Sequence, residues 1–273
     1  MIPYPDPATI LLHTIALEPA RWTSQRVSQS LLALLPRIAA AGFHAIEVFE
    51  PHLQAQEQWP QIQSVLREQG ITPVVLSSYI DLNPARTPDQ EIEQSTQRIK
   101  ACCAFFGFKK LRVFPGSGMQ PGDAESVRIY TERLARLVRA LPEVDILLET
   151  HDHSLADDPA AVLRIVQAVA APNLGLLYQP TLFKPQEAWD QFQLQKGHIR
   201  HLHLQNRNEE LGFVSLASGV VQWEKILGAA DASVGATLEF VPSGICPVEQ
   251  FDLETVLAQA KAEVEWIAGL GKK

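Results

Sequence analysis

The sequence predicts an α/β protein, a single (β/α)8 TIM barrel that forms one domain over residues 1–273. Its length of 273 residues is close to the roughly 250 typical of such a barrel. Short apolar runs alternate with amphipathic stretches along the whole chain, and we count eight such runs. An open doubly wound sheet would need no eighth strand, so the count favours a closed barrel.

The expected strands are nearly continuous in apolar residues, as in a parallel sheet that is covered on both faces. In chain order they cover residues 10–17, 45–50, 71–79, 111–115, 144–151, 174–180, 199–206 and 236–241. The stretches between them have helical period. Val127, Tyr130 and Leu134 recur at steps of three and four, with Asp123 as the expected N-cap and Pro142 as the stop.

Two further helices are signalled by their ends. Asp158 and Pro159 provide a capping residue and an N1 proline. An earlier apolar stripe built on Trp59 and Ile62 ends at Gly70, a typical C-terminal stop. No linker or low-complexity segment divides the chain, which favours one domain.

Composition narrows the classes of partner. The net charge is −8 and the pI about 5.5, and no Lys/Arg run is longer than the pair Lys109-Lys110. This balance argues against nucleic-acid binding, which needs a basic surface. No apolar run reaches the ~18 residues of a membrane span. Residues 1–7 lack the features of a signal peptide, and three cysteines, including the adjacent Cys102 and Cys103, make no disulfide framework. We therefore expect a soluble, cytoplasmic protein.

Four polar residues, Glu149, Gln179, His203 and Glu239, each end an apolar run, at steps of 30, 24 and 36 residues. Each step is about one strand-plus-helix unit, and the carboxyl ends of barrel strands face the active-site mouth. Two buried glutamates need a shared cation, a proton or basic partners. A divalent metal meets that need, with His203 supplying a nitrogen ligand. No Gly-x-Ser-x-Gly or His-Glu-x-x-His pattern is present, which excludes serine hydrolases and zincins.

Several segments, taken together, resemble the xylose-isomerase-like barrel superfamily, the sugar phosphate isomerase/epimerase group. Segment 41–48 (AGFHAIEV) is similar to the family's second-strand GF-x-x-IE pattern. Segments 148–151 (LETH), 173–176 (NLGL) and 201–204 (HLHL) are similar to its fifth, sixth and seventh strands. Segment 218–223 (SGVVQW) resembles the opening of the seventh crossover helix, and 238–239 (LE) matches the last strand.

The resemblance implies one divalent ion (Mn, Mg, Co or Zn) held by Glu149, Gln179, His203 and Glu239. It also implies a sugar or sugar-derivative isomerase/epimerase working through an ene-diolate, in which one glutamate removes a proton from a carbon next to a carbonyl and the other returns it. The ion would act as a Lewis acid. We expect the substrate-binding residues to be His151, Gln205 and Glu47.

The chain departs from the family pattern at two places. Gln179 stands where an acidic ligand is usual, which leaves two carboxylates rather than three around the ion. Gln205 and Asn206 stand where many relatives carry Lys-Asp. The alternative is therefore a non-catalytic sugar- or polyol-binding barrel with a degraded metal site. The polar segment 206–210 is either a solvated loop or a cover over the mouth.

A three-zinc DNA-repair endonuclease of the related barrel type is disfavoured, because its site needs more histidines and a basic face. The chain has eight histidines, and their close pairs are 151/153 and 201/203. The expected partner is a small carbohydrate, with no nucleic acid and no membrane. Such barrels often pair through their helix faces, so a homodimer is a further expectation.

Overall fold

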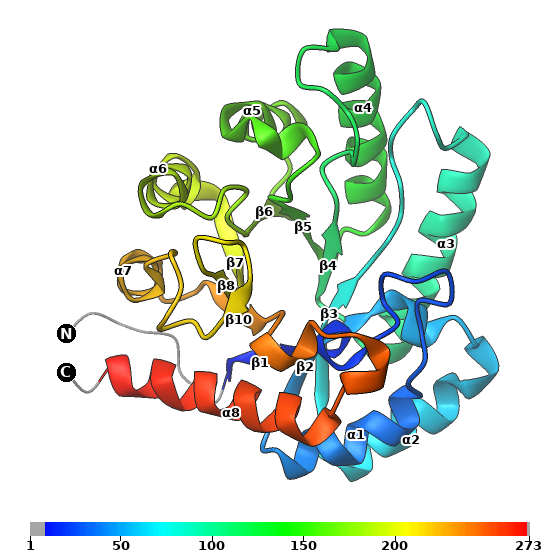
Figure 1. The fold of residues 1–273 in the computed structure, drawn as a ribbon. Helices are drawn as coiled ribbons and strands as arrows, with labels where there is room; N and C mark the ends of the chain where they lie inside the picture. The colour runs from blue at the N-terminus through cyan, green and yellow to red at the C-terminus, as the bar shows by residue number, and fades with distance from the viewer. Residues whose placement is uncertain (1–8, 272–273) are drawn as a thin grey trace. The chain divides into compact units, whose positions relative to one another are not determined.

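Eight strands close into a barrel in the computed structural model, which describes residues 9–271 (Figure 1). Their order around the barrel is β1-β10-β7-β6-β5-β4-β3-β2, which confirms the predicted (β/α)8 fold. The strands are β1 (Leu11–His13), β2 (Ala45–Phe49), β3 (Thr72–Ser77), β4 (Lys110–Val113), β5 (Asp145–Glu149), β6 (Leu174–Tyr178), β7 (Ile199–Leu204) and β10 (Gly235–Leu238). Residues 1–7, which bear on the signal-peptide prediction, lie outside the described range.

Eight α-helices alternate with these strands in the described part of the chain. They are α1 (Leu31–Ala40), α2 (Trp59–Glu68), α3 (Asp89–Phe106), α4 (Ala124–Ala140), α5 (Pro159–Val169), α6 (Pro185–Gln195), α7 (Trp223–Ala229) and α8 (Leu253–Leu270). The predicted ends are confirmed. Asp123 accepts a hydrogen bond from the Ser126 amide at 3.1 Å, Asp158 accepts one from the Ala160 amide at 2.9 Å, and Gly70 has a φ of +66° just beyond α2.

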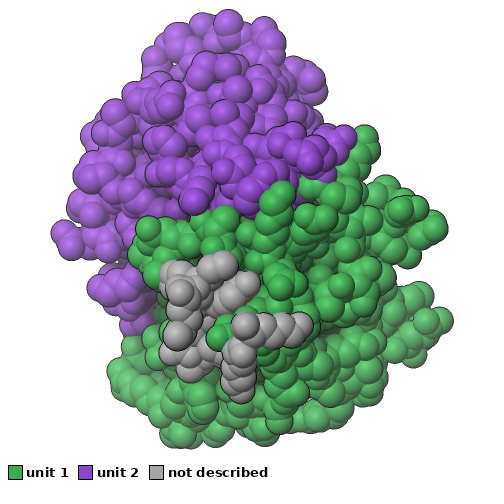
Figure 2. All heavy atoms as spheres, turned by 90° about the vertical axis from the view of Figure 1, so that its left-hand side faces the viewer, with its two compact units in different colours: residues 1–74, 183–185, 202–273 green, residues 75–182, 186–201 purple. Residues whose placement is uncertain are grey.

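The chain divides into two compact units, coloured separately in Figure 2. Unit 1 comprises Met1–Val74, Phe183–Pro185 and Leu202–Lys273, and unit 2 comprises Val75–Leu182 and Gln186–His201. In unit 1, β1 pairs in parallel with β2 and β10, so that Leu12 lies opposite Ile46 and Leu238. In unit 2, β5 pairs in parallel with β4 and β6. These central side chains are inaccessible to solvent, which is why the strands read as apolar runs.

The first strand is shorter than predicted. Only Leu11–His13 is extended, and Thr14–Leu17 forms a 3₁₀ helix. The cause is local: the Ile15 amide donates to Nδ1 of His13 at 3.1 Å, and the Thr14 hydroxyl accepts from the Phe49 amide at 2.9 Å. Such side-chain bonds to the backbone compete with the strand ladder.

A small hairpin replaces the loop expected after β7. β8 (Asn206–Arg207) pairs antiparallel with β9 (Phe213–Val214), and the Arg207 guanidinium lies 4.5 Å from the Phe183 ring centroid and 4.6 Å from that of Phe213. Elsewhere, Cys102 and Cys103 are buried on α3. None of the helices within residues 9–271 has the length and apolarity needed to cross a bilayer.

Candidate active site

Glu47 lies at the centre of a buried cluster in unit 1. The β1–β2 register sets His13 opposite Glu47, and Nε2 of His13 is 3.4 Å from Oε1 of Glu47. From β7, Nε2 of His203 lies 3.1 Å from Oε1 and 3.0 Å from Oε2 of the same carboxylate. All three residues are 0% exposed, so these contacts are shielded from water. Their ligand atoms lie within 4.8 Å of one another, as a metal-binding group requires.

The other nitrogen of His203 faces Glu239. Nδ1 of His203 is 3.5 Å from Oε1 of Glu239, while Oε2 of that carboxylate accepts a 2.7 Å hydrogen bond from the Gln205 side-chain amide. The Glu239 amide donates to the Leu204 carbonyl at 3.1 Å, which fixes the residue just beyond β10. A nitrogen lone pair and a carboxylate oxygen attract only through a proton or a cation between them. This donor set therefore fits a divalent ion such as Zn²⁺ or Mn²⁺.

Glu149, the last residue of β5 in unit 2, has a basic partner that sequence reasoning missed. Nε of Arg112, on β4, is 3.1 Å from Oε2 of Glu149, and both side chains are almost fully buried. Arg112 also donates from Nη1 to the Ser78 carbonyl at 3.0 Å, and its guanidinium lies 4.1 Å from the Phe114 ring centroid. The available signal was a charged residue inside the otherwise apolar run 111–115.

Gln179 follows β6 in unit 2, and its backbone is held firmly. Its amide donates to the Thr150 hydroxyl at 2.8 Å, and its carbonyl accepts from that hydroxyl at 2.6 Å and from the Gln191 side chain at 3.1 Å. The residue is only 5% exposed. Thr150 thus ties the end of β5 to the residue that the sequence places among the metal ligands.

His151 differs from the other expected substrate-binding residues in being partly exposed. Its Nδ1 lies 2.9 Å from Oδ1 of Asp152. Burial lowers the pKa of His151, but the hydrogen bond to Asp152 and the charge of Glu149 outweigh it and raise that pKa to about 9. Gln205 and Glu47, in contrast, are buried and bonded to protein groups. Their substrate-binding roles remain predictions.

Hydrogen bonds within the segment from Gln205 to Trp223 account for the Asn, Gly and Trp residues that follow β7 in the sequence. The Asn206 side-chain amide donates to the carbonyls of Leu216 at 2.8 Å and Val221 at 2.9 Å. A Cβ on Gly219 would lie 2.2 Å from Cγ of Asn206, so only glycine allows this close approach. The Trp223 indole donates to the Gln205 carbonyl at 2.8 Å. The sequence comparison marks Asn206 as an amide where many relatives carry a charged residue. In the structure its side chain binds the backbone at Leu216 and Val221.

A further buried carboxylate, Glu18, shapes the segment between β1 and α1. Its oxygens accept from the backbone amides of Ser28 at 2.8 Å, Gln29 at 2.9 Å and Ala20 at 3.2 Å, and Nε2 of His52 is 3.4 Å away. Burial raises the pKa of Glu18, but the bonds to His52, Ser28 and Gln29 outweigh it and lower that pKa to about 2.

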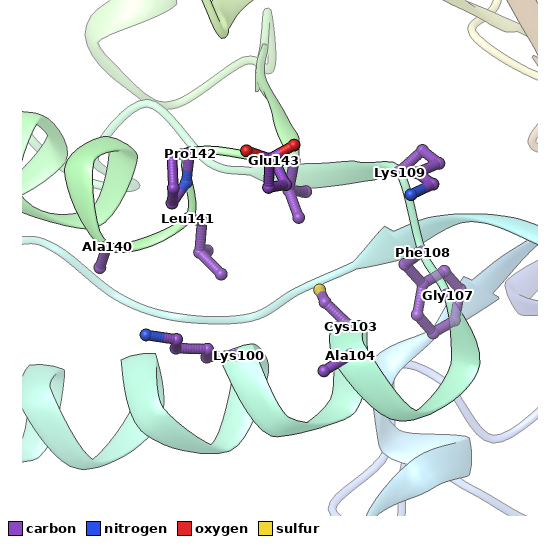
Figure 3. A pocket seen from close by; sticks show the side chains of 11 residues that line it. Lys100, Cys103, Ala104, Gly107, Phe108, Lys109, Ala140, Leu141, Pro142 and Glu143 are labelled. Carbon is purple, nitrogen blue, oxygen red and sulfur yellow. The ribbon is translucent and has the colours of Figure 1, made fainter.

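A pocket of about 350 Å³ in unit 2 lies at the amino-terminal ends of β4 and β5 (Figure 3). It is lined by Lys100 and Cys103 of α3 and by residues that precede β4 and β5, such as Lys109 and Val144. In a barrel of this class that end serves stability rather than chemistry. Glu149, at the carboxyl end of β5, belongs to the opposite end.

The fold is a (β/α)8 barrel with buried carboxylate and imidazole groups at the carboxyl ends of its strands. Residues 35–268 match the family model of the xylose isomerase-like TIM barrel, and the chain belongs to that family. The resemblance inferred from sequence is thereby confirmed. Over 217 residues the chain is 23% identical to the 3-dehydroshikimate dehydratase of Bacillus anthracis, covering 68% of this chain and 76% of the relative.

Solved structures share the fold over nearly the whole chain. The probable 3-DHS dehydratase AsbF of Bacillus anthracis aligns with a TM-score of 0.74 at 20% identity, over 95% of this chain and 98% of the other. The IolI protein with a bound zinc atom has a TM-score of 0.75 at 16% identity, over 95% and 97%. L-ribulose 3-epimerase has a TM-score of 0.68 at 16% identity, over 96% and 93%. The chain's neighbours thus include enzymes of more than one reaction type.

Proposed function

We propose that this protein is a metal-dependent isomerase or epimerase that moves a proton at a carbon next to the carbonyl of a sugar or sugar derivative. The observation that carries the proposal is Nδ1 of His203 facing Oε1 of Glu239 at 3.5 Å, on a carboxylate that Gln205 orients. Family membership and the zinc in IolI support it. We assign one divalent ion to Glu149, Gln179, His203 and Glu239.

Each proposed ligand belongs to the carboxyl end of its own strand, the end that carries the active site in barrels of this class. A bound divalent ion would supply Lewis-acid stabilisation of the negative charge that develops on the substrate oxygens. Glu149 and Glu239 would remove and return the proton. The Gln205 amide holds the Glu239 carboxylate in one orientation, and Arg112 compensates the charge of buried Glu149. Gln179 would contribute a neutral amide oxygen.

Metal binding is the first test. Saturating Mn²⁺, Co²⁺, Mg²⁺ or Zn²⁺ should raise the Tm, because a ligand at 100 times its Kd stabilises the folded state by about 2.7 kcal/mol. His203→Gln should abolish the rise, whereas His44→Gln, at an exposed position, should retain it. Less than about a tenth of an equivalent of metal in protein purified without chelators, together with no Tm rise for any of these ions, would sink the proposal.

Proton transfer is the second test, and it separates the enzyme from a barrel that only binds a polyol. Gln179, which removes a charge from the site, favours the binder. The protein should wash deuterium from solvent into one or more members of a ketose panel, and Glu149→Gln should stop the exchange. Binding of a ketose without any exchange would favour the non-catalytic alternative.

Dehydration is the second candidate reaction, favoured by the match to the 3-dehydroshikimate dehydratase. Removal of a proton next to a carbonyl is also the first step in eliminating a β-hydroxyl group, so the same carboxylates would serve. A rise in ultraviolet absorbance on incubation with 3-dehydroshikimate, from the new conjugated double bond, would identify this reaction. Exchange without such a rise favours the epimerase.

Three expectations complete the proposal. We propose that residues 1–273 work as one catalytic domain, that the protein acts in the cytoplasm, and that two copies pair through their helix faces. Light scattering tests the pairing, since a monomeric mass at micromolar concentration contradicts it.

A further inference from the structure

We infer that Glu47 is a positioning residue: its carboxylate, anchored by His13, holds a proton on Nε2 of His203 and so leaves Nδ1 as the atom that binds the ion. The inference rests on the proposed metal site for its consequence. Its immediate claim, the location of a proton, concerns unit 1 alone and is tested separately.

The chain of hydrogen bonds begins at a backbone amide. The Ile15 N–H points at Nδ1 of His13 over 3.1 Å, and a backbone amide can only donate. Nδ1 of His13 is therefore the acceptor, and the hydrogen of this neutral imidazole lies on Nε2. That nitrogen is the one 3.4 Å from Oε1 of Glu47. The short 3₁₀ turn after β1 thus sets the tautomer of His13.

Glu47 in turn determines the tautomer of His203. A carboxylate only accepts hydrogen bonds, and Nε2 of His203 lies 3.0 and 3.1 Å from its two oxygens. Nε2 of His203 therefore carries a hydrogen, and Nδ1 is the nitrogen directed at Glu239. Because all these side chains except Glu239, at 5%, are 0% exposed, water offers no competing partner. A charge-assisted bond in such surroundings favours this tautomer about 10- to 100-fold.

A histidine ligand commonly donates its second N–H to a carboxylate, which fixes the ring and raises its basicity. Loss of such a partner typically weakens metal binding about 10- to 100-fold. Glu47 would therefore affect metal affinity without touching the substrate. This role differs from the substrate-binding role that the sequence suggests for it.

The same three side chains could instead hold an ion themselves, since their ligand atoms lie within 4.8 Å of one another. Two arguments disfavour this reading. In the tautomers inferred above, both Nε2 atoms carry hydrogens that Glu47 accepts. An ion at Nε2 of His203 beside another at Nδ1 would also require the ring to lose both protons. Counting bound ions distinguishes the two readings.

The experiment uses full-length protein with ¹⁵N-labelled histidine and two-bond ¹H–¹⁵N spectra, with and without one equivalent of Zn²⁺. Substituted variants assign the His13 and His203 signals. We expect hydrogen on Nε2 of both rings in each state, and Nδ1 of His203 shifted by Zn²⁺. A His203 ring without hydrogen on Nε2 in the wild-type protein overturns the inference.

Glu47→Gln, compared with Glu57→Gln on the exposed 3₁₀ turn before α2, tests the consequence. In Glu47→Gln the His203 Nε2 hydrogen should exchange with solvent faster than in the wild-type protein. Zn²⁺ affinity, measured against a chromophoric chelator, should fall about 10- to 100-fold. At saturating metal, KM for a substrate found by the exchange panel should stay within about twofold, since the substrate contacts are retained.

Three outcomes contradict the inference: unchanged Zn²⁺ affinity, a raised KM at saturating metal, or a second Zn²⁺ per chain that Glu47→Gln removes. Failure of the wild-type protein to bind any of Zn²⁺, Mn²⁺, Co²⁺ and Mg²⁺ would instead refute the proposed metal site, while the proton on Nε2 of His203 would still be read from the spectra.

Discussion

The contact between Gly219 and Asn206 makes a sharp test of how unit 1 is held together. A methyl group at Gly219 would sit 2.2 Å from Cγ and 2.3 Å from Oδ1 of Asn206, far inside van der Waals contact. The Gly219 backbone lies outside the left-handed region, so Gly219→Ala adds volume without backbone strain. Asn206 is 1% exposed and must move to admit the methyl group.

Moving Asn206 breaks hydrogen bonds, and these set the size of the effect. Its amide donates to Leu216 at 2.8 Å and Val221 at 2.9 Å, and its Oδ1 accepts from the amides of Val221 and Arg207, both at 3.0 Å. A buried hydrogen bond contributes about 1 kcal/mol net, and an unpaired buried group costs about 1–3 kcal/mol. We expect Gly219→Ala to lower the free energy of unfolding by about 2–4 kcal/mol.

The assay is urea unfolding followed by tryptophan fluorescence, for the single variants and for Gly219→Ala combined with Asn206→Ala. With Asn206 shortened, the new methyl group has room, so the second substitution should cost no more than about 0.5 kcal/mol. Gly122→Ala, where no atom lies within 4 Å of the added Cβ, is the matched control and should be nearly neutral. Equal costs for Gly219→Ala in both backgrounds would refute the steric reasoning.

Two further predictions concern buried charges. Because the pKa of Glu18 is lowered from 4.5 to about 2, its ionised form stabilises the fold fully above pH 4.5, by about 3 kcal/mol at most, and this contribution is lost as the pH falls from 4.5 to 2. Urea midpoints between pH 2 and 6 should therefore depend less on pH in Glu18→Gln, and identical profiles contradict the assignment. Arg112→Met should lower the free energy of unfolding by about 3–5 kcal/mol, because Glu149 would lose its buried partner. Adding Glu149→Gln should restore much of that loss in the same urea assay, whereas an equally unstable double variant would show that the ion pair is not the cause.

The barrel was accessible from sequence because its strands are buried on both faces and short. Each of the eight predicted runs overlaps a barrel strand, and Asp123 and Asp158 mark helix starts by a local rule. Local side-chain hydrogen bonds were harder to predict. The run 10–17 is so apolar that it is read as one strand, although His13 and Thr14 impose a turn within it. The β8–β9 hairpin was not predicted, because strands of two residues are too short to show alternation of apolar and polar residues.

Site residues could be predicted from sequence only where the local sequence around one residue was sufficient. Glu149, His203 and Glu239 lie at the ends of apolar runs, so their positions at strand ends could be predicted. Their partners could not, because contact with Arg112 or Glu47 joins residues 37 and 156 positions apart in the chain. A charged or imidazole side chain inside a buried run, as in 10–13 or 111–115, was the available clue. The four-residue metal site stays a prediction.

Because Glu18 binds mainly backbone amides, the amino-acid sequence of the segment after β1 can vary without loss of these hydrogen bonds. Three of its hydrogen bonds end on the backbone amides of Ala20, Ser28 and Gln29, and every residue except proline supplies such an amide. Residues 22–26 are exposed and follow a barrel strand, where loops select the substrate. The side chains of residues 22–26 can therefore change without removing the amides at residues 20, 28 and 29 that the Glu18 carboxylate binds on either side of them.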